Sequence, residues 1–531
     1  MESSFDFIVV GAGPAGSALA IGLASSAKKP SVLLLEAGGQ MMTTILGLMG
    51  SEHCANRAID YSRGKGLGGS SAINFGCYTI GAKDDYEEWA RLVGDQSFNW
   101  DNIQARFKRL ETLHANLPAG VESKYTSPKS ENHGGSGKLQ VGYAAEWEKD
   151  VSPMLDMFEE AGFPMNPDHN SGNPIGMALS INSAHNGRRS TASDLLAPKP
   201  ENLTIITDSP VQRVIFEGRR AVGIETNGKT YSASKEVILS AGALNTPRIL
   251  MHSGLGPRQQ LEKFGISVIE EIPAVGQGLR DRPFCALAFK RKDGDTDRPS
   301  FYGDKQAMDA ALEQRHGLVQ ARELVASEEF KALAADVQAY LNKETVPHCE
   351  ILTHLPIHWL APNFPQDSLN YSAFAVFLYN AQVRGEATLQ SADPDAALKF
   401  DPKFLSSVFD RRVAIEALRE ALRFTKYQGF AKDTIAPIAA PADESDEGLL
   451  DYWRQTMSSS WHMSGTAKMG KADDTEAVVN SRFKVVGVQN LRVADMSAVP
   501  ILASCHVQAV AYVTGMTCAD MIIEEYGLAG I

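Results

Sequence analysis

The hydrophobic residues near the N-terminus come in short continuous runs rather than in alternating patterns. Residues 6–10 (DFIVV) and 31–35 (SVLLL) each begin with one polar residue and continue as an apolar run. Runs of this kind predict strands buried on both faces, as in a parallel sheet covered by helices. Residues 14–25, between the two runs, are expected to form a helix. The pattern therefore predicts a strand–helix–strand unit at the start of the chain.

The middle of the chain predicts a different arrangement. Residues 371–379 and 386–390 are expected to be strands of one sheet, with an amphipathic helix over 413–427 behind it. The stretch 306–343 has helical periodicity with acidic and basic residues mixed, which is typical of a solvated helical face. A lid or a dimer contact is a less favoured interpretation of that stretch.

Composition and charge narrow the class of protein. A chain of 531 residues, 44% of them hydrophobic, is long enough for about two domains. The net charge of −13 disfavours nucleic acid and anionic membranes, so we expect a small-molecule partner. The six cysteines are scattered, without the spacing of a zinc site or a disulfide framework.

The N-terminal apolar run does not have the features of a targeting signal. It covers residues 8–24, but Glu2 and Asp6 precede it where basic residues would be expected. No stretch reaches the roughly 18 uninterrupted apolar residues of a membrane span, and the last residues carry no peroxisomal signal. These features predict a cytoplasmic protein.

The first predicted turn carries a dinucleotide-binding motif, GAGPAG, at residues 11–16. Gly11 permits a tight turn, Gly13 lets the backbone approach a diphosphate, and Gly16 lets the helix pack closely on the strand. Glu36 follows the second strand, where its carboxylate can accept hydrogen bonds from ribose hydroxyls. The unit indicates dinucleotide binding, but by itself it does not separate FAD from NAD.

Further segments carry a family resemblance. Residues 63–74 (RGKGLGGSSAIN) are a second glycine-rich segment, and residues 242–256 (GALNTPRILMHSGLG) follow another predicted strand. Together with the first motif, they closely resemble the signature patterns of the glucose-methanol-choline oxidoreductase family. Residues 460–470, 490–495 and 505–506 also follow in the family order.

The resemblance implies an α/β fold with a Rossmann-like FAD-binding domain and a second, substrate-binding domain built on an antiparallel sheet. The motifs fall in three separated blocks, so the FAD-binding domain is expected to be discontinuous. It would comprise residues 1–80, 185–285 and 450–531. Residues 81–184 and 286–449 would form the substrate-binding domain.

The resemblance also implies which residues contact FAD. Glu36 would hold the adenosine ribose, Val211 would meet the adenine, and residues 74–77 would run alongside the flavin. A last helix over 508–525 would aim its positive end at the flavin pyrimidine ring. The expected cofactor-binding residues are Gly11, Gly13, Pro14, Ala15, Gly16, Glu36, Ala37, Gly69, Ser70, Asn74, Phe75, Gly76, Cys77, Val211, Asp495, Val507 and Gln508.

Two positions depart from the family pattern. Some relatives attach FAD covalently through a histidine at the position that is Ile73 here, so we expect non-covalent FAD. Many relatives also carry a histidine after the aspartate of the segment 278–282, where this chain has Arg282 after Asp281. Contacts there are expected to differ.

Two histidines are the candidate catalytic residues. Alcohol oxidation removes the hydroxyl proton while hydride leaves the carbon, and histidine can supply both the base and a hydrogen-bond partner. The family pairs a histidine with a second histidine or an asparagine, and the matching residues here are His462 and His506. We expect His462 to be the general base, or its substrate-binding equivalent, and His506 to orient the alkoxide, although a coupled pair shares its titration.

Three histidines between residues 348 and 358 raise the alternative of a metal site. Two of them are four residues apart, a spacing that can chelate a metal on a helix, but Pro356 argues against a helix there. We therefore expect no metal and interpret this stretch as substrate-pocket lining. The residues concerned are His348, His354, His358, Trp359 and Phe364.

The leading hypothesis is an FAD-dependent alcohol oxidase or dehydrogenase whose flavin is reoxidised by O₂ or another acceptor. Aromatic residues in the middle segments favour an aryl or other apolar primary alcohol. An intracellular, biosynthetic role is expected. The alternative is a non-redox lyase or cyclase that uses the same histidines for acid–base catalysis. A catalytically silent scaffold is disfavoured because both histidines are present, and the oligomeric state stays open.

Overall fold

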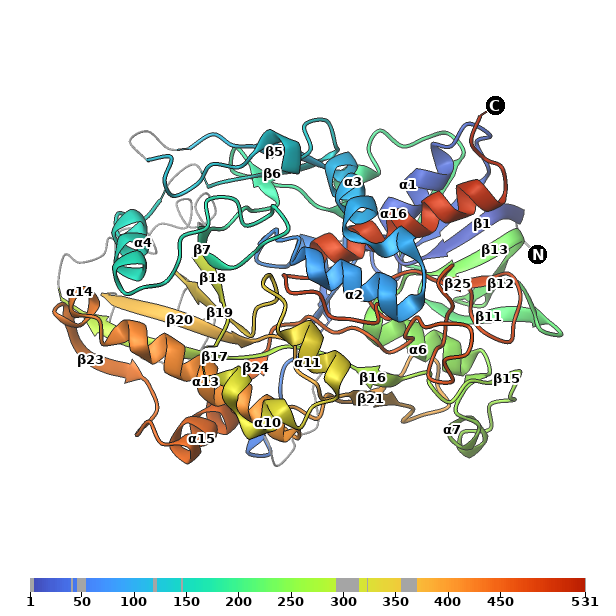
Figure 1. Ribbon diagram of the computed structural model, residues 1–531. Helices are drawn as coiled ribbons and strands as arrows, with labels where there is room; N and C mark the ends of the chain where they lie inside the picture. The colour runs from blue at the N-terminus through green and yellow to red at the C-terminus, as the bar shows by residue number, and fades with distance from the viewer. Residues whose placement is uncertain are drawn as a thin grey trace.

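Two large sheets organise the computed structural model (Figure 1). One sheet is mostly parallel and the other is antiparallel. This arrangement is expected for an α/β nucleotide-binding domain joined to a second domain built on an antiparallel sheet. The structure describes residues 4–39, 42–44, 54–117, 122–144, 147–292, 315–321, 323–354 and 370–530.

The first sheet has seven strands. In order across the sheet they are β10 (Leu203–Ile206), β2 (Val32–Leu35), β1 (Ser4–Val10), β13 (Lys229–Leu239), β12 (Arg220–Thr226) and β11 (Val211–Glu217), with β25 (Leu491–Val493) also paired to β13. Strands β10, β2, β1, β13 and β25 pair in parallel, whereas β11, β12 and β13 form an antiparallel meander. The continuous apolar runs of β1 and β2 are buried, as predicted.

Two helices pack together against this sheet. The predicted first helix is α1 (Pro14–Ala24), and the predicted last helix is α16 (Gln508–Glu525). They lie side by side in Figure 1, and most residues of both are buried. Gly515 permits the close approach, since a Cβ there would meet the Ala15 carbonyl oxygen at 2.0 Å. Residues near both ends of the chain therefore form one layer.

The second sheet has six antiparallel strands. In order they are β18 (Arg315–Val319), β19 (Cys349–Thr353), β20 (Tyr371–Leu378), β17 (Pro283–Arg291) and β23 (Thr434–Ala439), with β24 (Ser458–Ser459) also paired to β17. Helix α13 (Val408–Thr425), predicted over 413–427, packs on β20. The fold class is thus confirmed, including the antiparallel second sheet.

Several local predictions differ from the structure. The strand expected over 386–390 is β21 (Gly385–Thr388), but it pairs with β16 (Gln277–Leu279) and β22 (Lys399–Asp401) in a separate three-stranded sheet. Gly385 allows this pairing because a Cβ there would meet the Asp401 carbonyl oxygen at 2.1 Å. Strand β24, which lies in the block 450–531, pairs with β17 of the second sheet. The predicted division into two domains stays a prediction.

The stretch 306–343, predicted to be helical, is only partly so. Its described residues form the strand β18 and two short helices, α10 (Glu328–Lys331) and α11 (Ala335–Leu341). Pairing with the buried strand β19 outweighs the charge periodicity on which the prediction rested. Residues 306–314 lie outside the described part of the chain.

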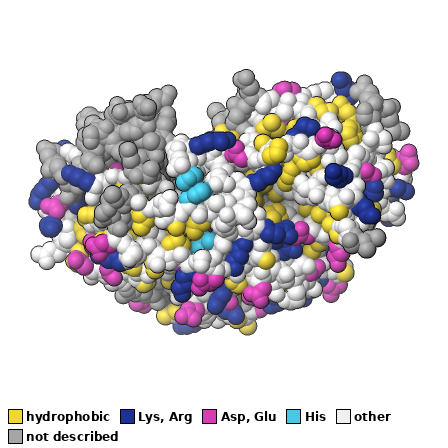
Figure 2. Space-filling model, turned by 90° about the horizontal axis from the view of Figure 1, so that it is seen from above, with side chains coloured by type: hydrophobic (Ala, Val, Ile, Leu, Met, Phe, Trp, Pro, Cys, Tyr) yellow, Lys and Arg dark blue, Asp and Glu magenta, His cyan; other side chains and the backbone are white. Residues whose placement is uncertain are grey.

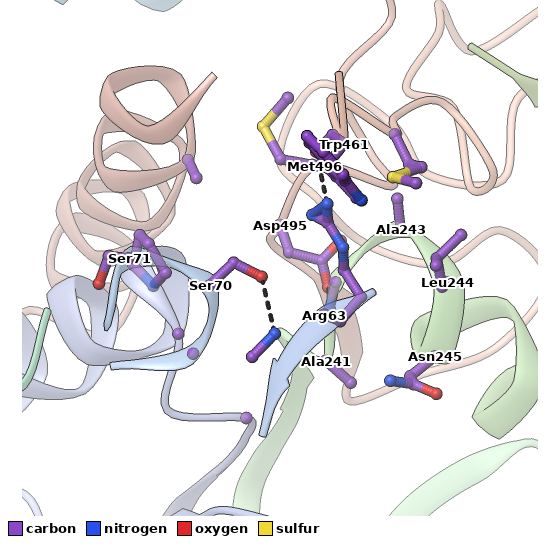
Figure 3. Close-up of a pocket in the computed structure, with 18 of the residues that line it drawn as sticks. Arg63, Ser70, Ser71, Ala241, Ala243, Leu244, Asn245, Trp461, Asp495 and Met496 are labelled. Atoms are coloured by element: carbon purple, nitrogen blue, oxygen red, sulfur yellow. Dashed lines mark hydrogen bonds between the residues drawn. The ribbon is translucent and has the colours of Figure 1, made fainter. Parts of the chain in front are cut away.

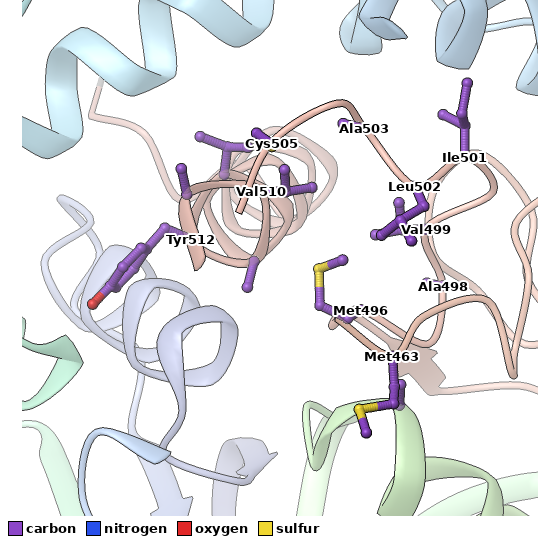
Figure 4. Packing of buried hydrophobic residues seen from close by; sticks show 14 of the residues in the cluster. Met463, Met496, Ala498, Val499, Ile501, Leu502, Ala503, Cys505, Val510 and Tyr512 are labelled. Atoms are coloured by element: carbon purple, nitrogen blue, oxygen red, sulfur yellow. The ribbon is translucent and has the colours of Figure 1, made fainter. Parts of the chain in front are cut away.

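The C-terminal segment contributes many residues to the hydrophobic core. Met463, Met496, Val499, Leu502 and Tyr512 belong to one buried hydrophobic cluster, which brings loops of this segment against α16 (Figure 4). Outside the core, Figure 2 shows acidic and basic side chains mixed over one face. No helix in the described part of the chain is long and apolar enough to cross a membrane.

Candidate active site

One cavity of about 720 Å³ collects the motifs into a single site. Every predicted cofactor-binding residue except Gly16 lines it, and so do His462 and His506. Gly16 lies behind the wall, where a Cβ would meet the Gly11 carbonyl oxygen at 1.9 Å, so its place is in the helix–strand contact. The cavity therefore extends from the first glycine turn to the two histidines.

The glycine-turn end of the cavity suits a diphosphate. A Cβ on Gly13 would have no atom within 4 Å, so the backbone there is open to the cavity. Gly11 has a φ of +101°, which a non-glycine residue rarely adopts. Helix α1 begins at this point with no side-chain cap and no acidic residue in its first turn. Its amides and positive end are thus available to an anion.

Glu36 forms hydrogen bonds with backbone amides of both glycine-rich segments. Its carboxylate accepts hydrogen bonds from the backbone amides of Ala12 at 2.8 Å, Gly38 at 3.0 Å and Gly66 at 3.0 Å. Burial raises the pKa of Glu36, and these hydrogen bonds oppose the rise. Glu36 also lines the cavity, so the carboxylate predicted to bind ribose is held in place by backbone on three sides.

Asn74 and Gln508 connect the second glycine-rich segment to the start of α16. The Asn74 side-chain amide donates to Gln508 Oε1 at 3.1 Å, and Gln508 Nε2 donates to the Cys77 carbonyl at 2.8 Å. Arg189 donates to Asn74 Oδ1 at 2.7 Å. Helix α16 has no acidic residue in its first turn, so its positive end is exposed to the cavity lined by Val507 and Gln508.

The middle of the cavity is shown in Figure 3. Asp495 accepts hydrogen bonds from the Gly242 amide at 2.9 Å and from Thr246 Oγ1 at 2.6 Å, which fixes the start of α6 (Gly242–His252). Arg63 donates to the Trp461 carbonyl at 2.6 Å. Neither Arg63 nor Trp461 was predicted as a site residue, although both lie within or beside the family segments.

The two candidate catalytic histidines face each other. Their ring centroids are 5.1 Å apart and the rings are nearly perpendicular, at 86°. His462 Nδ1 lies 3.0 Å from Ser460 Oγ and 3.4 Å from the Arg282 guanidinium. His506 Nε2 lies 3.1 Å from a carboxylate oxygen of Glu350, on β19.

The neighbours of the two histidines shift their pKa values in opposite directions. Burial, together with the positive charges of His506 and Arg282, holds the pKa of His462 well below its usual value. Burial also opposes charge on His506, but Cys77 and Glu350 outweigh it and raise the pKa of His506 well above its usual value. Near neutral pH, the geometry thus favours a neutral His462 beside a protonated His506.

The histidine end of the cavity has an aromatic wall. Phe284 lies 5.1 Å from Phe377 and 6.4 Å from Trp461, and Phe75 lies 6.1 Å from Trp461, between ring centroids. Phe75 is predicted from the family motif, whereas Phe284 and Phe377 belong to strands without a motif. An apolar molecule can therefore contact rings on several sides of the histidine pair.

The expected pocket lining around residue 350 is wrong in its described part. His348 and His354 do not line the cavity, whereas Leu352 does. His348 is buried and accepts from the Ala321 amide at 3.1 Å, and His354 lies 3.3 Å from an Asp150 carboxylate oxygen. His358, Trp359 and Phe364 lie outside the described residues. The expectation that the chain holds no metal stays a prediction.

The mostly parallel sheet and the glycine-lined cavity form a dinucleotide-binding site, and comparison with known proteins gives the family and the cofactor. A family model described as GMC oxidoreductase matches residues 5–284, and a second one with that description matches residues 381–515. The chain belongs to the GMC oxidoreductase family, whose members bind FAD. The residues at the glycine turns, Glu36 and the start of α16 fit that cofactor.

Individual relatives match along nearly the whole chain. The chain is 30% identical to the dehydrogenase pkfF of Emericella nidulans, over 98% of this chain and 93% of that protein. It is also 30% identical to the oxygen-dependent choline dehydrogenase 1 of Chromohalobacter salexigens, over 98% and 94%. A formate oxidase structure from Aspergillus oryzae has a TM-score of 0.87 at 25% identity, with 99% of both chains covered.

Proposed function

We propose that this protein oxidises an apolar primary alcohol, of the aryl type, to the carbonyl compound, with His462 as the base and His506 as the residue that orients the oxygen. The observation that carries the proposal is the pair of facing histidine rings, 5.1 Å apart at one end of the cavity, with Ser460 and Arg282 beside His462 and Glu350 beside His506. When bound, FAD supplies the hydride acceptor. The residues of the chain must then supply proton transfer and positioning.

Ser460 prepares His462 to accept a proton. Its hydroxyl donates to the Arg282 carbonyl at 2.8 Å, so the hydroxyl oxygen can accept from His462 Nδ1–H at 3.0 Å. The Arg282 guanidinium, which can only donate, lies farther from Nδ1, at 3.4 Å, so the tautomer is assigned from the shorter contact. With the proton on Nδ1, the Nε2 lone pair is the basic site. The backbone amide of His462 donates to Asp281 at 2.8 Å, which fixes the residue itself. His462 can therefore take the hydroxyl proton at Nε2.

Glu350 prepares His506 to remain charged. The buried carboxylate accepts from Tyr379 at 2.8 Å and lies 3.1 Å from nitrogens of both His316 and His506. A protonated His506 stabilises the negative charge that develops on the substrate oxygen as its proton leaves. The backbone amide of His506 donates to Thr79 Oγ1 at 2.7 Å, so the residue is held at its backbone as well as at its ring.

The aromatic wall supports the substrate class. An aryl alcohol can contact Phe284, Phe377 and Trp461 while its hydroxymethyl group reaches the histidines. A sugar would place several hydroxyls against these rings without hydrogen-bond partners, which costs free energy. The oxidation product is the corresponding aldehyde.

The test is anaerobic mixing of the FAD-loaded enzyme with aryl, aliphatic and sugar alcohols while the flavin absorbance is followed. Aryl alcohols should bleach the flavin fastest, and His462→Ala and His506→Ala should each slow bleaching by about 10²-fold or more. Admitting air then separates an oxidase from a dehydrogenase. Fastest bleaching by sugars would contradict the substrate class. A flavin that dithionite reduces but no alcohol bleaches would favour the non-redox lyase or cyclase.

A further inference from the structure

A second cavity, of about 130 Å³, is lined in part by Asp281 and Arg282, which contact the segments that carry the two histidines. Helix α2 (Lys83–Val93), α11 and the turn 380–384 enclose it, and Ile501 and Leu502, labelled in Figure 4, form its apolar wall. Arg280 and Arg384 also line it. No step of the proposed oxidation uses this cavity.

Arg280 and Arg384 bring two guanidinium groups to the cavity, and the carboxylates of Asp410 and Glu476 act on the charge of Arg384 only from a distance. No side chain or carbonyl of the described residues forms a hydrogen bond or an ion pair with the Arg280 guanidinium. Among the described residues, Arg384 donates to the carbonyls of residues 381–383, at 3.3, 2.6 and 2.9 Å. Burial lowers the pKa of Arg280 well below its usual value, and repulsion from Arg384 lowers it further. Burial also lowers the pKa of Arg384 to about 10.

The acidic side chains around the cavity are engaged elsewhere. Glu88 and Asp336 both pair with the exposed Arg91, at 2.6 and 3.4 Å. Asp281 accepts from Ser459 Oγ at 2.5 Å and from two backbone amides. Arg280 and Arg384 are both partly buried, and among the described residues no carboxylate forms a hydrogen bond or ion pair with either guanidinium. An anion that reaches the cavity can therefore pair with both groups.

We propose that this cavity binds a small tetrahedral oxyanion, such as inorganic phosphate or sulfate, between Arg280 and Arg384. A guanidinium presents parallel N–H donors that match the oxygens of such an anion, and two guanidinium groups can hold it from two sides. The volume of about 130 Å³ is sufficient for one phosphate and too small for a nucleotide.

Binding there would bear on the catalytic loops. Asp281 and Arg282 also line the cavity, and Asp281 holds the His462 amide at 2.8 Å. Arg282 donates to carbonyls in the segment 502–505, directly before His506. The anion would neutralise charge beside both loops and stabilise the folded state that contains the site.

The test uses FAD-loaded enzyme, so that the diphosphate end of the large cavity is already filled. Sodium phosphate is titrated at constant ionic strength, with calorimetry and the thermal midpoint as readouts. Wild type should bind one phosphate saturably, and Arg280→Gln should weaken binding by at least about tenfold. Arg258→Gln, which removes a half-exposed arginine on α7 (Arg258–Lys263), is the matched control and should behave as wild type.

The difference in thermal midpoint between Arg280→Gln and wild type distinguishes an anion site from a structural role of Arg280, because phosphate should reverse its sign. Without oxyanion, Arg280→Gln should melt at or above wild type because it removes repulsion from Arg384, whereas in phosphate it should melt below wild type. If Arg280→Gln does not fold, Arg280→Lys, which keeps the charge but loses the paired donors, should bind phosphate more weakly. Equal phosphate binding by Arg280→Gln and wild type, absence of saturable binding, or equal binding of chloride would overturn the proposal.

Discussion

At the residue scale, the pKa values of the two buried histidines shift in opposite directions because their neighbours differ. His462 has Arg282 and His506 beside it, which oppose protonation, while His506 has Glu350, which favours protonation. Both histidines lie in segments that resemble a known family, so both were predictable. Glu350 was not, because it lies in the buried strand β19 and reaches His506 across a sequence separation of 156 residues.

Glu350→Gln should move the alkaline limb of the pH profile of kcat/KM to lower pH. The carboxylate raises the pKa of His506, so its loss lets His506 deprotonate earlier as pH rises. The raised pKa also means that His506 contributes stability fully below the pKa of an unfolded histidine and loses it as pH rises through the folded value. The thermal midpoint of the variant should therefore fall less steeply than that of the wild type as pH rises above neutrality. An unchanged alkaline limb would contradict this role of Glu350.

Arg282→Gln should move the acid limb of kcat/KM to higher pH. The guanidinium lies 3.4 Å from His462 Nδ1 and lowers the pKa of that histidine, so the neutral base persists to more acidic pH in the wild type. The same profile measured for Arg258→Gln controls for a general change of charge. A fall in rate with no shift of the acid limb would show that Arg282 only supports the carbonyls it contacts.

At the element scale, the structure depends on the contact between α1 and α16. Both helices were predicted from sequence because each is adjacent to a family segment and is apolar on most of its surface. The separate three-stranded sheet that contains β21 was not predicted. Its partner β16 lies more than a hundred residues before β21 in the sequence, although β22 is close. Local alternation identifies a strand but not its neighbour.

Gly515→Ala should destabilise the protein by about 1–3 kcal/mol and weaken FAD binding. Alanine normally favours a helix over glycine, but its Cβ would meet the Ala15 carbonyl oxygen at 2.0 Å and push α16 away from α1. Denaturant unfolding and flavin titration measure the two effects. Gly135→Ala is the control, since a Cβ there has no atom within 4 Å. Stability equal to that of the control would contradict the close contact.

At the scale of the whole molecule, one cofactor cavity joins residues from the two sheets. The residues that line the dinucleotide-binding end of the cavity could be predicted, because glycine turns and strand ends have recognisable local sequences. The residues that line the aromatic end of the cavity could not be predicted. Phe284, Leu352 and Phe377 come from different strands, which are brought together by the pairing of the second sheet. The small arginine-lined cavity had no sequence signal at all.

The FAD should be removable without breaking a covalent bond, because Ile73 lines the cavity where some relatives carry the linking histidine. Acid precipitation should therefore leave the yellow colour in the supernatant. Removing FAD should lower the thermal midpoint, and restoring it at 100 times its dissociation constant should return about 2.7 kcal/mol. Flavin that stays with the precipitated protein would contradict the prediction.

The hydrogen bond between Asn74 and Gln508 spans 434 residues of sequence. A growing polypeptide therefore presents its first glycine turns to the cell long before the segment that closes the cavity has been translated. Until then, the apolar surface of α1 that α16 covers must remain exposed or be protected by a chaperone. Cofactor capture is consequently a late event in biogenesis, and nascent chains stalled before residue 508 should be unable to retain flavin.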